Sequence, residues 1–351
     1  MVSDFHSRPE DIILHAHSGK RRAWSFKAYT KGNIYYMNEH NTTMERKVFT
    51  GERALFQAKD LTLSDCTFDD GESPLKHSEN ITCSRCSFKW KYPFWYAKHI
   101  HVKDSVLFEM SRSGLWYGQD LTFEDTMIEA PKEFRRCDGV TLRHVTLPNA
   151  QETLWTCRNV RLENVVAKGE YFGKDSVNIF ADHLELYGNY CFDGARNIEI
   201  HNAKLLSKDS FWNTENVTVC DSYIAGEYLG WNSKNLTFMN CTIESLQGFD
   251  YIKKLTLRDC TLLNTTLAFE YSTVDATIKG RVDSILNPKG GVICADEVGT
   301  LIRDKKFVNP ENTIVLADGM PVKPVSGADV ELISGQGRET KLHVRKQNRE
   351  A

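Results

Sequence analysis

The chain has 351 residues, of which 41% are hydrophobic and 26% are charged, and its formal net charge at pH 7 is −3. This length and apolar content are ample for one large hydrophobic core. A nearly balanced charge without a long basic run argues against a nucleic-acid partner, and no apolar segment is long enough to span a membrane. We therefore expect neither nucleic acid nor a membrane as a partner.

Residues 1–47 lack the repeat that follows them and carry a basic cluster, Lys20, Arg21 and Arg22. We expect them to form an N-terminal extension that includes the cap an open coil edge needs. The first residues contain no apolar run that fits a secretory signal. Several of the ten cysteines fall at positions predicted to be buried, where a free thiol behaves as a small hydrophobic group. Buried free thiols and the absence of a signal predict a cytoplasmic protein.

A repeat of about 19 residues then runs from Leu61 to Leu262. Its first apolar residue, the anchor, recurs as Leu61, Ile81, Ile100, Leu121, Val140, Val160, Ile179, Ile198, Val217, Leu236 and Leu255. Apolar and polar residues alternate after each anchor, which predicts a strand with one buried face. Further apolar columns lie five and seven residues after the anchor and six residues before it. Each repeat therefore offers inward side chains from three predicted short strands.

A repeat this short cannot fold alone and must stack on its own copies. We therefore predict an all-β protein: a single-stranded, right-handed parallel β-helix, that is, a solenoid of about 11–12 coils over residues 48–300. A leucine-rich repeat is the alternative. Against it, the position three residues before the anchor is small, and no segment has the pattern of an amphipathic helix. An Asn precedes several anchors, which predicts left-handed turns whose amides bond along the axis.

The period fails beyond Val274. Residues 275–298 resemble one or two irregular closing coils, and residues 301–351 are expected to form a partly disordered C-terminal extension. Cys83 and Cys86 have the spacing of a zinc-binding pair, but both lie on the inward pattern and no second pair follows. We expect neither a metal nor a cofactor.

One outward column, five residues before each anchor, lacks a sufficient structural cause. This column, called the stripe below, reads Phe56, Lys76, Trp95, Trp116, Arg135, Trp155, Lys174, Asp193, Trp212, Trp231 and Asp250. Exposed aromatic stripes usually mark a contact surface, and flat rings among charged groups suit sugars. The predicted ligand-binding residues, from the stripe and beside it, are Trp95, Trp116, Arg136, Glu152, Trp155, Tyr171, Trp212 and Trp231.

Catalysis on a sugar needs acid and base groups, and the stripe offers candidates. These are Lys174, Asp193, Arg135 and the neighbouring Asp209. The sequence thus favours binding or processing of a carbohydrate, an oligosaccharide or an acidic sugar; an enzyme of this kind would be a carbohydrate-active lyase or hydrolase. The alternative is a non-catalytic structural or interaction protein, with the stripe used for self-association in a homo-oligomer. Stacked aromatic and oppositely charged pairs also stabilise a sheet without any ligand, by about 0.2–1 kcal/mol each.

Five segments resemble a mainly microbial β-helix family known as DUF3737, which is similar in architecture to pectin lyases. They are residues 51–56, 92–96, 211–219, 226–231 and 267–272. The resemblance covers about residues 48–300 and implies the β-helix fold. It supplies no activity and no catalytic residues, and a shared fold does not by itself give a function.

Overall fold

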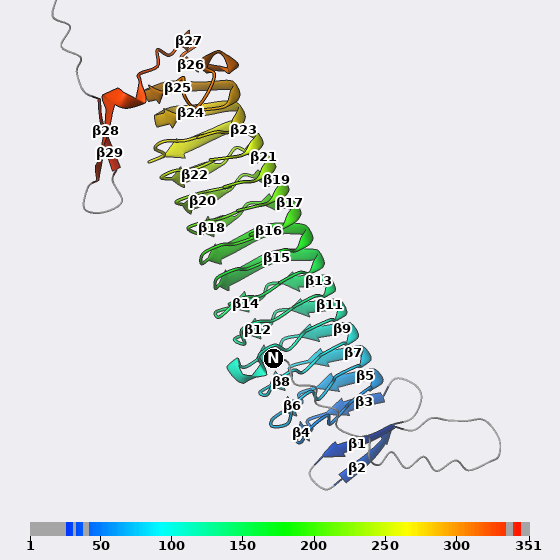
Figure 1. Ribbon diagram of the computed structural model, residues 1–351. Coiled ribbons are helices and arrows are strands. Elements are labelled where there is room, and N and C mark those ends of the chain that lie inside the picture. The colour runs from blue at the N-terminus through cyan, green and yellow to red at the C-terminus, as the bar shows by residue number, and fades with distance from the viewer. Residues whose placement is uncertain (1–25, 31–32, 38–41, 335–339, 345–351) are drawn as a thin grey trace, which may run out of the picture.

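The computed structural model describes residues 26–30, 33–37, 42–334 and 340–344. The basic cluster Lys20, Arg21 and Arg22 and the polar end of the chain, residues 345–351, lie outside the described residues. The described chain is a long parallel β-solenoid of about 15 turns (Figure 1). The predicted single-stranded parallel β-helix is therefore confirmed.

Most coils contribute two strands, and each strand pairs in parallel with its equivalents in the coils before and after it. The first strands are β3 (Thr42–Glu45), β5 (Lys59–Ser64), β7 (Glu79–Ser84), β9 (Lys98–Lys103), β11 (Gln119–Glu124), β13 (Asp138–Arg143), β17 (Arg196–His201), β19 (Glu215–Cys220) and β21 (Lys234–Met239). The second strands are β4 (Val48–Phe49), β6 (Thr67–Phe68), β8 (Ser87–Phe88), β10 (Val106–Leu107), β12 (Met127–Ile128), β14 (Thr146–Leu147), β18 (Lys204–Leu206), β20 (Tyr223–Gly226) and β22 (Thr242–Ser245). In five coils the two run on as one: β15 (Arg158–Lys168), β16 (Val177–Tyr187), β23 (Lys253–Leu263), β24 (Thr273–Leu286) and β25 (Gly290–Ile302).

The solenoid has more coils than the predicted 11–12. One coil, β3 with β4, precedes Leu61, and three follow the last anchor: β24, β25 and β26 (Thr313–Ala317). The register shifts in the β24–β25 pairing between Ile278 and Arg281, so the backbone ladder continues while the side-chain period is lost. The proposed boundaries after residues 47 and 300 stay a prediction, and the parallel strands run from Thr42 to Ala317.

Antiparallel pairs lie at both ends of the solenoid (Figure 1). The hairpin of β1 (Phe26–Thr30) and β2 (Asn33–Met37) lies beside β4. At the other end β27 (Met320–Pro321) pairs with β26, and β28 (Val330–Ser334) pairs with β29 (Thr340–Val344). Three single-turn 3₁₀ helices complete the elements: η1 (Glu109–Ser111), η2 (Pro310–Asn312) and η3 (Gly327–Asp329). The described residues contain no α-helix, which excludes the leucine-rich repeat alternative.

The inward columns form one continuous core. Every anchor is buried, and stacked rings such as Phe49, Phe68 and Phe88 run along the axis with centroids 4.9 and 4.8 Å apart. All ten cysteines are free and nine are buried, as expected for small apolar groups. The third side of the coil differs from the prediction. It is a turn segment rather than a strand, and neighbouring coils are joined there by backbone hydrogen bonds, such as Tyr96 N–H to the Trp116 carbonyl oxygen at 2.9 Å, and by isolated bridges such as Trp116 to Arg135.

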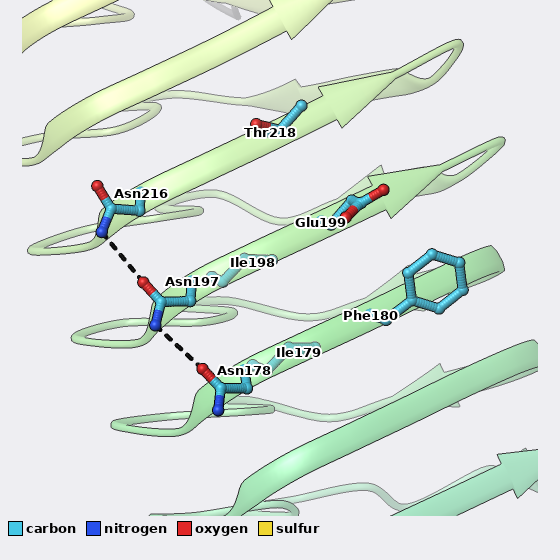
Figure 2. Close-up of a pocket in the computed structure, with 8 residues that line it drawn as sticks. All are labelled: Asn178, Ile179, Phe180, Asn197, Ile198, Glu199, Asn216 and Thr218. Atoms are coloured by element: carbon cyan, nitrogen blue, oxygen red, sulfur yellow. Dashed lines mark hydrogen bonds between the residues drawn. The ribbon is translucent and has the colours of Figure 1, made fainter.

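Asn residues before the anchors form a ladder, as predicted. Asn178, Asn197 and Asn216 have φ of 60°, 56° and 60°, in the left-handed region that Asn tolerates. Each side-chain amide donates to the amide oxygen of the preceding coil: Asn197 Nδ2 to Asn178 Oδ1 at 3.0 Å, and Asn216 Nδ2 to Asn197 Oδ1 at 3.0 Å (Figure 2). The Asn ladder therefore stabilises the left-handed turn that precedes the first strand in these coils.

Asn197→Ala and Asn197→Gly should separate the two contributions of this ladder. Alanine removes both amide bonds and strains the left-handed backbone, so we expect a loss of about 2 kcal/mol in unfolding free energy. Glycine removes the bonds but keeps the backbone unstrained, so it should cost about 1 kcal/mol less. Urea unfolding followed by circular dichroism measures both. Equal losses would show that backbone conformation contributes nothing here.

Candidate functional site

The stripe lies on the turn segments that precede the first strand of each coil. Its aromatic and charged side chains are mostly half-buried, but its last two residues differ: Trp231 is 37% exposed, whereas Asp250 is only 7% exposed. Each stripe residue is followed by a residue with positive φ, such as Tyr96 after Trp95 or Tyr117 after Trp116. Most are preceded by an inward aromatic or aliphatic residue, but glycine precedes Lys174 and Trp231. The left-handed residue turns the chain toward the next strand and leaves the stripe residue on the outside.

The N-terminal part of the stripe is a closed stack, and we call Lys76, Trp95, Trp116, Arg135 and Trp155 the closed part. The Trp95 and Trp116 rings are nearly parallel, at 10°, with centroids 5.4 Å apart. The Arg135 guanidinium carbon lies 5.1 Å from the Trp116 ring centroid and 4.3 Å from that of Trp155. The Lys76 amine lies 5.5 Å from the Trp95 ring. Ring faces in this part are therefore occupied by neighbours from adjacent coils.

The indole N–H groups are also used within the chain. Each donates to a backbone carbonyl of the next coil: Trp95 to Ser113 at 2.5 Å, Trp116 to Lys132 at 3.0 Å, Trp155 to Tyr171 at 2.7 Å, and Trp212 to Tyr228 at 2.6 Å. This repeated bond fixes the rings edge-on to the coil. It gives the tryptophans a packing role that sequence periodicity alone did not reveal.

Two of the three cations of the stripe, Arg135 and Lys174, are paired with carboxylates. Arg135 forms an ion pair with Glu152, which Lys132 also approaches at 3.2 Å. Lys174 forms an ion pair with Asp193 on the next coil. Burial acts to lower the pKa of Lys174, but the hydrogen bond and charge of Asp193 outweigh it and raise the pKa. Lys174 is therefore held as an ammonium group, which disfavours its use as a base.

The remaining predicted site residues are divided between separate places. Tyr171 lies under the Lys174 amine, 5.3 Å from its ring centroid, and so joins that pair. Arg136 is exposed and packs over the ring of Tyr117. Asp209 is 2% exposed and lies beside Tyr190, and burial raises its pKa. The structure thus gathers Arg135 with Glu152 and two tryptophans, and Lys174 with Asp193 and Tyr171.

At its C-terminal end the aromatic stack opens. Trp212 and Trp231 are tilted by 44°, Trp231 and Tyr251 by 66°, and Tyr251 and Tyr271 by 42°, with centroids 5.2, 6.0 and 5.2 Å apart. Trp231 and Tyr251 are 37% and 45% exposed. Tilted rings cannot cover each other's faces, so parts of these faces remain open to solvent. The predicted ligand-binding residues include Trp212 and Trp231 but neither Tyr251 nor Tyr271.

Two carboxyl groups stand beside these open rings. Asp250 ends the stripe, and Glu270 occupies the equivalent place on the next coil, where its N–H donates to Asp250 Oδ1 at 3.0 Å. Burial, with a smaller contribution from the charge of Glu270, raises the pKa of Asp250 to about 8. Burial also raises the pKa of Glu270. Neither carboxyl has an ion-pair partner within the described residues. We call Trp231, Asp250, Tyr251, Glu270 and Tyr271 the open end.

Sequence analysis could have found this pair. Phe249 and Phe269 stack in the core, which aligns Asp250 with Glu270 at a spacing of 20 residues. Since the period fails beyond Val274, the anchors alone do not show that Glu270 is equivalent to Asp250. A carboxyl that stays protonated near neutral pH can donate a proton or a hydrogen bond, and it can become a carboxylate when a cation approaches.

A polar ladder runs beside the open end. Asn213 Nδ2 donates to Asp193 Oδ1 at 2.9 Å, and Asn232 Nδ2 donates to Asn213 Oδ1 at 2.8 Å. Since a side-chain amide has two donors and two lone pairs, each Asn keeps hydrogen-bonding capacity. Amides and open rings therefore lie next to each other along the coils leading into β19, β21 and β23.

A shallow, open depression lies on a different face, over β16, β17 and β19 (Figure 2). Its lining combines the Asn ladder with outward strand residues: Asn178, Ile179, Phe180, Asn197, Ile198, Glu199, Asn216 and Thr218. The ladder amides bond to one another, and Arg161 covers the Phe180 ring at 4.5 Å. Because this ring is covered, the depression lacks the open aromatic faces that the open end offers to a ligand.

The described residues also bear on metal binding and on membrane insertion. Among the described residues, no group of three or more His, Cys, Asp or Glu side chains is placed to hold a metal ion. No helix in the described part of the chain is long and apolar enough to cross a membrane.

Comparison with known proteins gives one strong match. The model of a family described as "Protein of unknown function (DUF3737)" matches residues 42–316. No curated protein sequence matches the chain. Similar solved structures include PfbA, a surface adhesin of Streptococcus pneumoniae, with 12% identity, 87% of this chain and 85% of that chain covered, and a TM-score of 0.25. Another is the A-module of the mannuronan C-5 epimerase AlgE4 of Azotobacter vinelandii, with 9% identity, 82% and 88% coverage, and a TM-score of 0.23. Scores this low carry no argument about function.

Proposed function

The chain belongs to the DUF3737 family, whose description assigns no function, and from that premise we propose that its stripe binds an oligosaccharide at the open end. The observation that carries the proposal is the change in ring packing along the stripe. Parallel rings with covered faces give way to tilted, exposed rings at Trp231 and Tyr251. Aromatic faces beside a few hydrogen-bonding groups are the usual composition of a ligand site.

The polar ladder supports the same proposal. A sugar lying on the Trp231 ring would place its hydroxyl groups near the side-chain amides of Asn232 and Asn213, which retain donors and lone pairs. Successive coils repeat at about 4.8 Å, so rings and amides recur along the axis and suit a ligand made of repeated units. The proposal concerns binding of the sugar. Processing of the sugar would need acid and base groups, and the catalytic roles of Lys174, Asp193, Arg135 and Asp209 stay a prediction.

The closed part supports a different role for Trp95, Trp116 and Trp155. Their faces are covered by each other and by Arg135, and their indole N–H groups are bonded to the backbone. We propose that they stabilise the turn segments between coils rather than contact a ligand. In this proposal the rings of the open end, and not Trp95, Trp116 and Trp155, contact the ligand.

Trp231→Ala should weaken oligosaccharide binding by on the order of tenfold or more, which corresponds to about 1.4 kcal/mol. Binding would first be found with a panel of uronate, neutral and amino-sugar oligosaccharides and then measured by isothermal titration calorimetry. Trp95→Ala is the matched control, because it removes the same side chain from the closed part. It should lower the melting temperature but leave the affinity unchanged. The proposal is wrong if the parent protein binds nothing in the panel, or if both variants lose affinity equally.

Self-association is the second candidate, and the exposed fractions of Trp231, Tyr251 and the nearby Tyr228 favour it. A second copy could cover these rings in a homo-oligomer. Sedimentation equilibrium of the parent and of Trp231→Ala over a range of concentrations tests this. A monomer at every concentration would exclude self-association.

The cytoplasmic location predicted from the sequence stays part of the proposal. It is tested by fractionating cells that express the protein.

A further inference from the structure

Ten aromatic residues on the outer face of the described solenoid have a cation over the ring from their own chain. The pairs are Arg53 with Phe56, Lys76 with Trp95 and Tyr96, Lys91 with Trp90, Arg135 with Trp116 and Trp155, Arg136 with Tyr117, Arg161 with Phe180, Lys174 with Tyr171, and Lys204 with Tyr187. A cation over a ring face stabilises by about 0.5–1 kcal/mol when exposed and about 2 kcal/mol when desolvated. Stacking between coils thus places ring and cation together repeatedly.

The rings of the open end are among the outer aromatic groups of the described chain that have no such cation. No Lys or Arg of the described chain lies over the rings of Trp231, Tyr251 or Tyr271, although these rings are tilted and partly exposed. The same place has two carboxyl groups, Asp250 and Glu270, that form no ion pair with any described residue. Ring faces and carboxyl groups that a bound cation can hold ionised lie together here, and no described Lys or Arg occupies the place.

We propose that the open end binds an ammonium group, and that in the oligosaccharide of the proposed function this group is the protonated amine of an amino sugar. Trp231, Tyr251 and Tyr271 provide the ring faces, and Asp250 and Glu270 provide the counter-charge. Only the sugar rests on the proposed function, whereas the ammonium site rests on the rings and carboxyls themselves.

The charges of the stripe argue against the acidic sugar expected from sequence. An acidic sugar would need a cation of the stripe, but Glu152 neutralises Arg135, Asp193 neutralises Lys174, and Lys76 lies over the Trp95 ring far from the open end. Arg135 is also enclosed between two indole rings. At the open end a uronate would meet the carboxyls of Asp250 and Glu270, which repel it or must stay protonated. A cationic sugar instead gains from both the rings and the carboxyls.

Burial of the carboxyls is consistent with this site. Asp250 and Glu270 both have a raised pKa because they are partly removed from water without a neighbouring cation. An ammonium group bound between them would favour the ionised forms and compensate for the loss of hydration. The unliganded protein therefore carries an electrostatic cost here that a cationic ligand would relieve.

The first test uses the parent protein with two small probes of the same shape and different charge. Choline carries a quaternary ammonium group, and 3,3-dimethyl-1-butanol is its neutral counterpart. We expect choline to shift the NMR signals of the Trp231 indole and to bind on the order of tenfold or more tightly than the alcohol. Equal affinity for the two probes, or no binding of choline, would overturn the ammonium site.

Two variants locate the probe. Glu270→Gln keeps the shape of the side chain and removes its charge, so it should weaken choline binding several-fold. Tyr251→Leu removes one ring face and should have a similar effect. Tyr96→Leu is the control, because Tyr96 is also exposed but already has Lys76 beside it, and it should leave choline binding unchanged. Unaltered affinity in Glu270→Gln and Tyr251→Leu would place the probe elsewhere and overturn the assignment.

Oligosaccharides distinguish this inference from the proposed function. Glucosamine oligomers should bind more tightly than N-acetylglucosamine oligomers of the same length, which lack the charged amine. Equal binding of both would support the oligosaccharide site and overturn the ammonium preference. Binding of choline without binding of any oligosaccharide would support the ammonium site, overturn the proposed function, and indicate that the ammonium group belongs to another kind of ligand.

Discussion

Replacing Glu133 with glutamine is expected to make the protein more stable at neutral pH and to reduce the dependence of its stability on pH. The Glu133 carboxyl is fully buried, and burial raises its pKa well above its usual range. Its Oε2 accepts the Gly114 N–H at 2.7 Å, in space that opens because Gly114 has no side chain. Oε1 is buried and has no hydrogen-bond partner in the described part of the chain. The folded protein therefore keeps Glu133 protonated.

The sign of the effect follows from proton binding. Above about pH 4.5 the unfolded chain releases the Glu133 proton, whereas the folded chain retains it. Stability therefore falls as pH rises above this value, because folding must take up a proton. Glutamine is neutral at every pH and has nearly the same shape, so the variant should approach the parent in stability at pH 4 and exceed it at pH 7. Urea unfolding at several pH values from 4 to 8 measures the difference.

Asp250 provides the control for this experiment. The pKa of Asp250 is also raised, to about 8. Asp250→Asn should therefore remove a further part of the fall in stability between about pH 4 and pH 8. Glu133→Ala should behave differently from glutamine, because it leaves the Gly114 N–H without an acceptor and opens a cavity. We expect it to cost about 3 kcal/mol. A Glu133→Gln profile parallel to that of the parent would show that Glu133 is ionised in the folded protein.

Gly188→Ala is expected to be among the most damaging single substitutions in the solenoid. Gly188 has a φ of 149°, and a Cβ added there would lie 2.0 Å from the carbonyl oxygen of Gly169 on the previous coil. The obstacle is backbone, so it cannot move aside as a flexible side chain could. Strain and overpacking together should cost about 3 kcal/mol or more. Guanidinium unfolding would measure the loss, and hydrogen exchange should locate it at β16 and β18.

Gly280→Ala is the matched control for the Gly188 substitution. Gly280 also has a positive φ, 78°, but nothing lies within 4 Å of the added Cβ. Only the backbone preference is lost there, so we expect a cost of about 1 kcal/mol. Comparable losses at both positions would mean that the coils can separate at Gly169 without penalty.

Periodicity predicted the core because stacking requires an apolar side chain at the same repeat positions in every coil. A side chain that faces the axis in one coil has an equivalent that faces it in the next, so positions such as Ile81 and Phe88 form apolar columns. The prediction of a third strand was wrong for a related reason. Turn segments also place residues inward, for example Phe134 and Phe192, but these have φ of 54° and 62°, and an apolar pattern does not report φ. The last coils were predicted only as one or two irregular closing coils, because the register shift after Ile278 interrupts the period.

For the site, the sequence located the face but not the contacts on it. The stripe was predicted as an outward column, and Arg135 and Lys174 do lie on it. Whether a ring face is covered depends on the tilt of its neighbour: Trp95 and Trp116 are parallel, whereas Trp231 and Tyr251 are not. No spacing in the sequence encodes that tilt, because side-chain rotamers are set by contacts across coils.

By itself the sequence determined the architecture, the inward columns, the Asn ladder and the face on which a ligand site should be sought. It could do so because a short repeat must stack, and stacking turns each repeat position into a row of neighbours. Only the tertiary structure decided how the charges pair, which rings are open, and which carboxyls lack a cation. Those properties depend on distances between side chains of adjacent coils, and the pKa of Asp250 in particular depends on its burial and on Glu270 beside it.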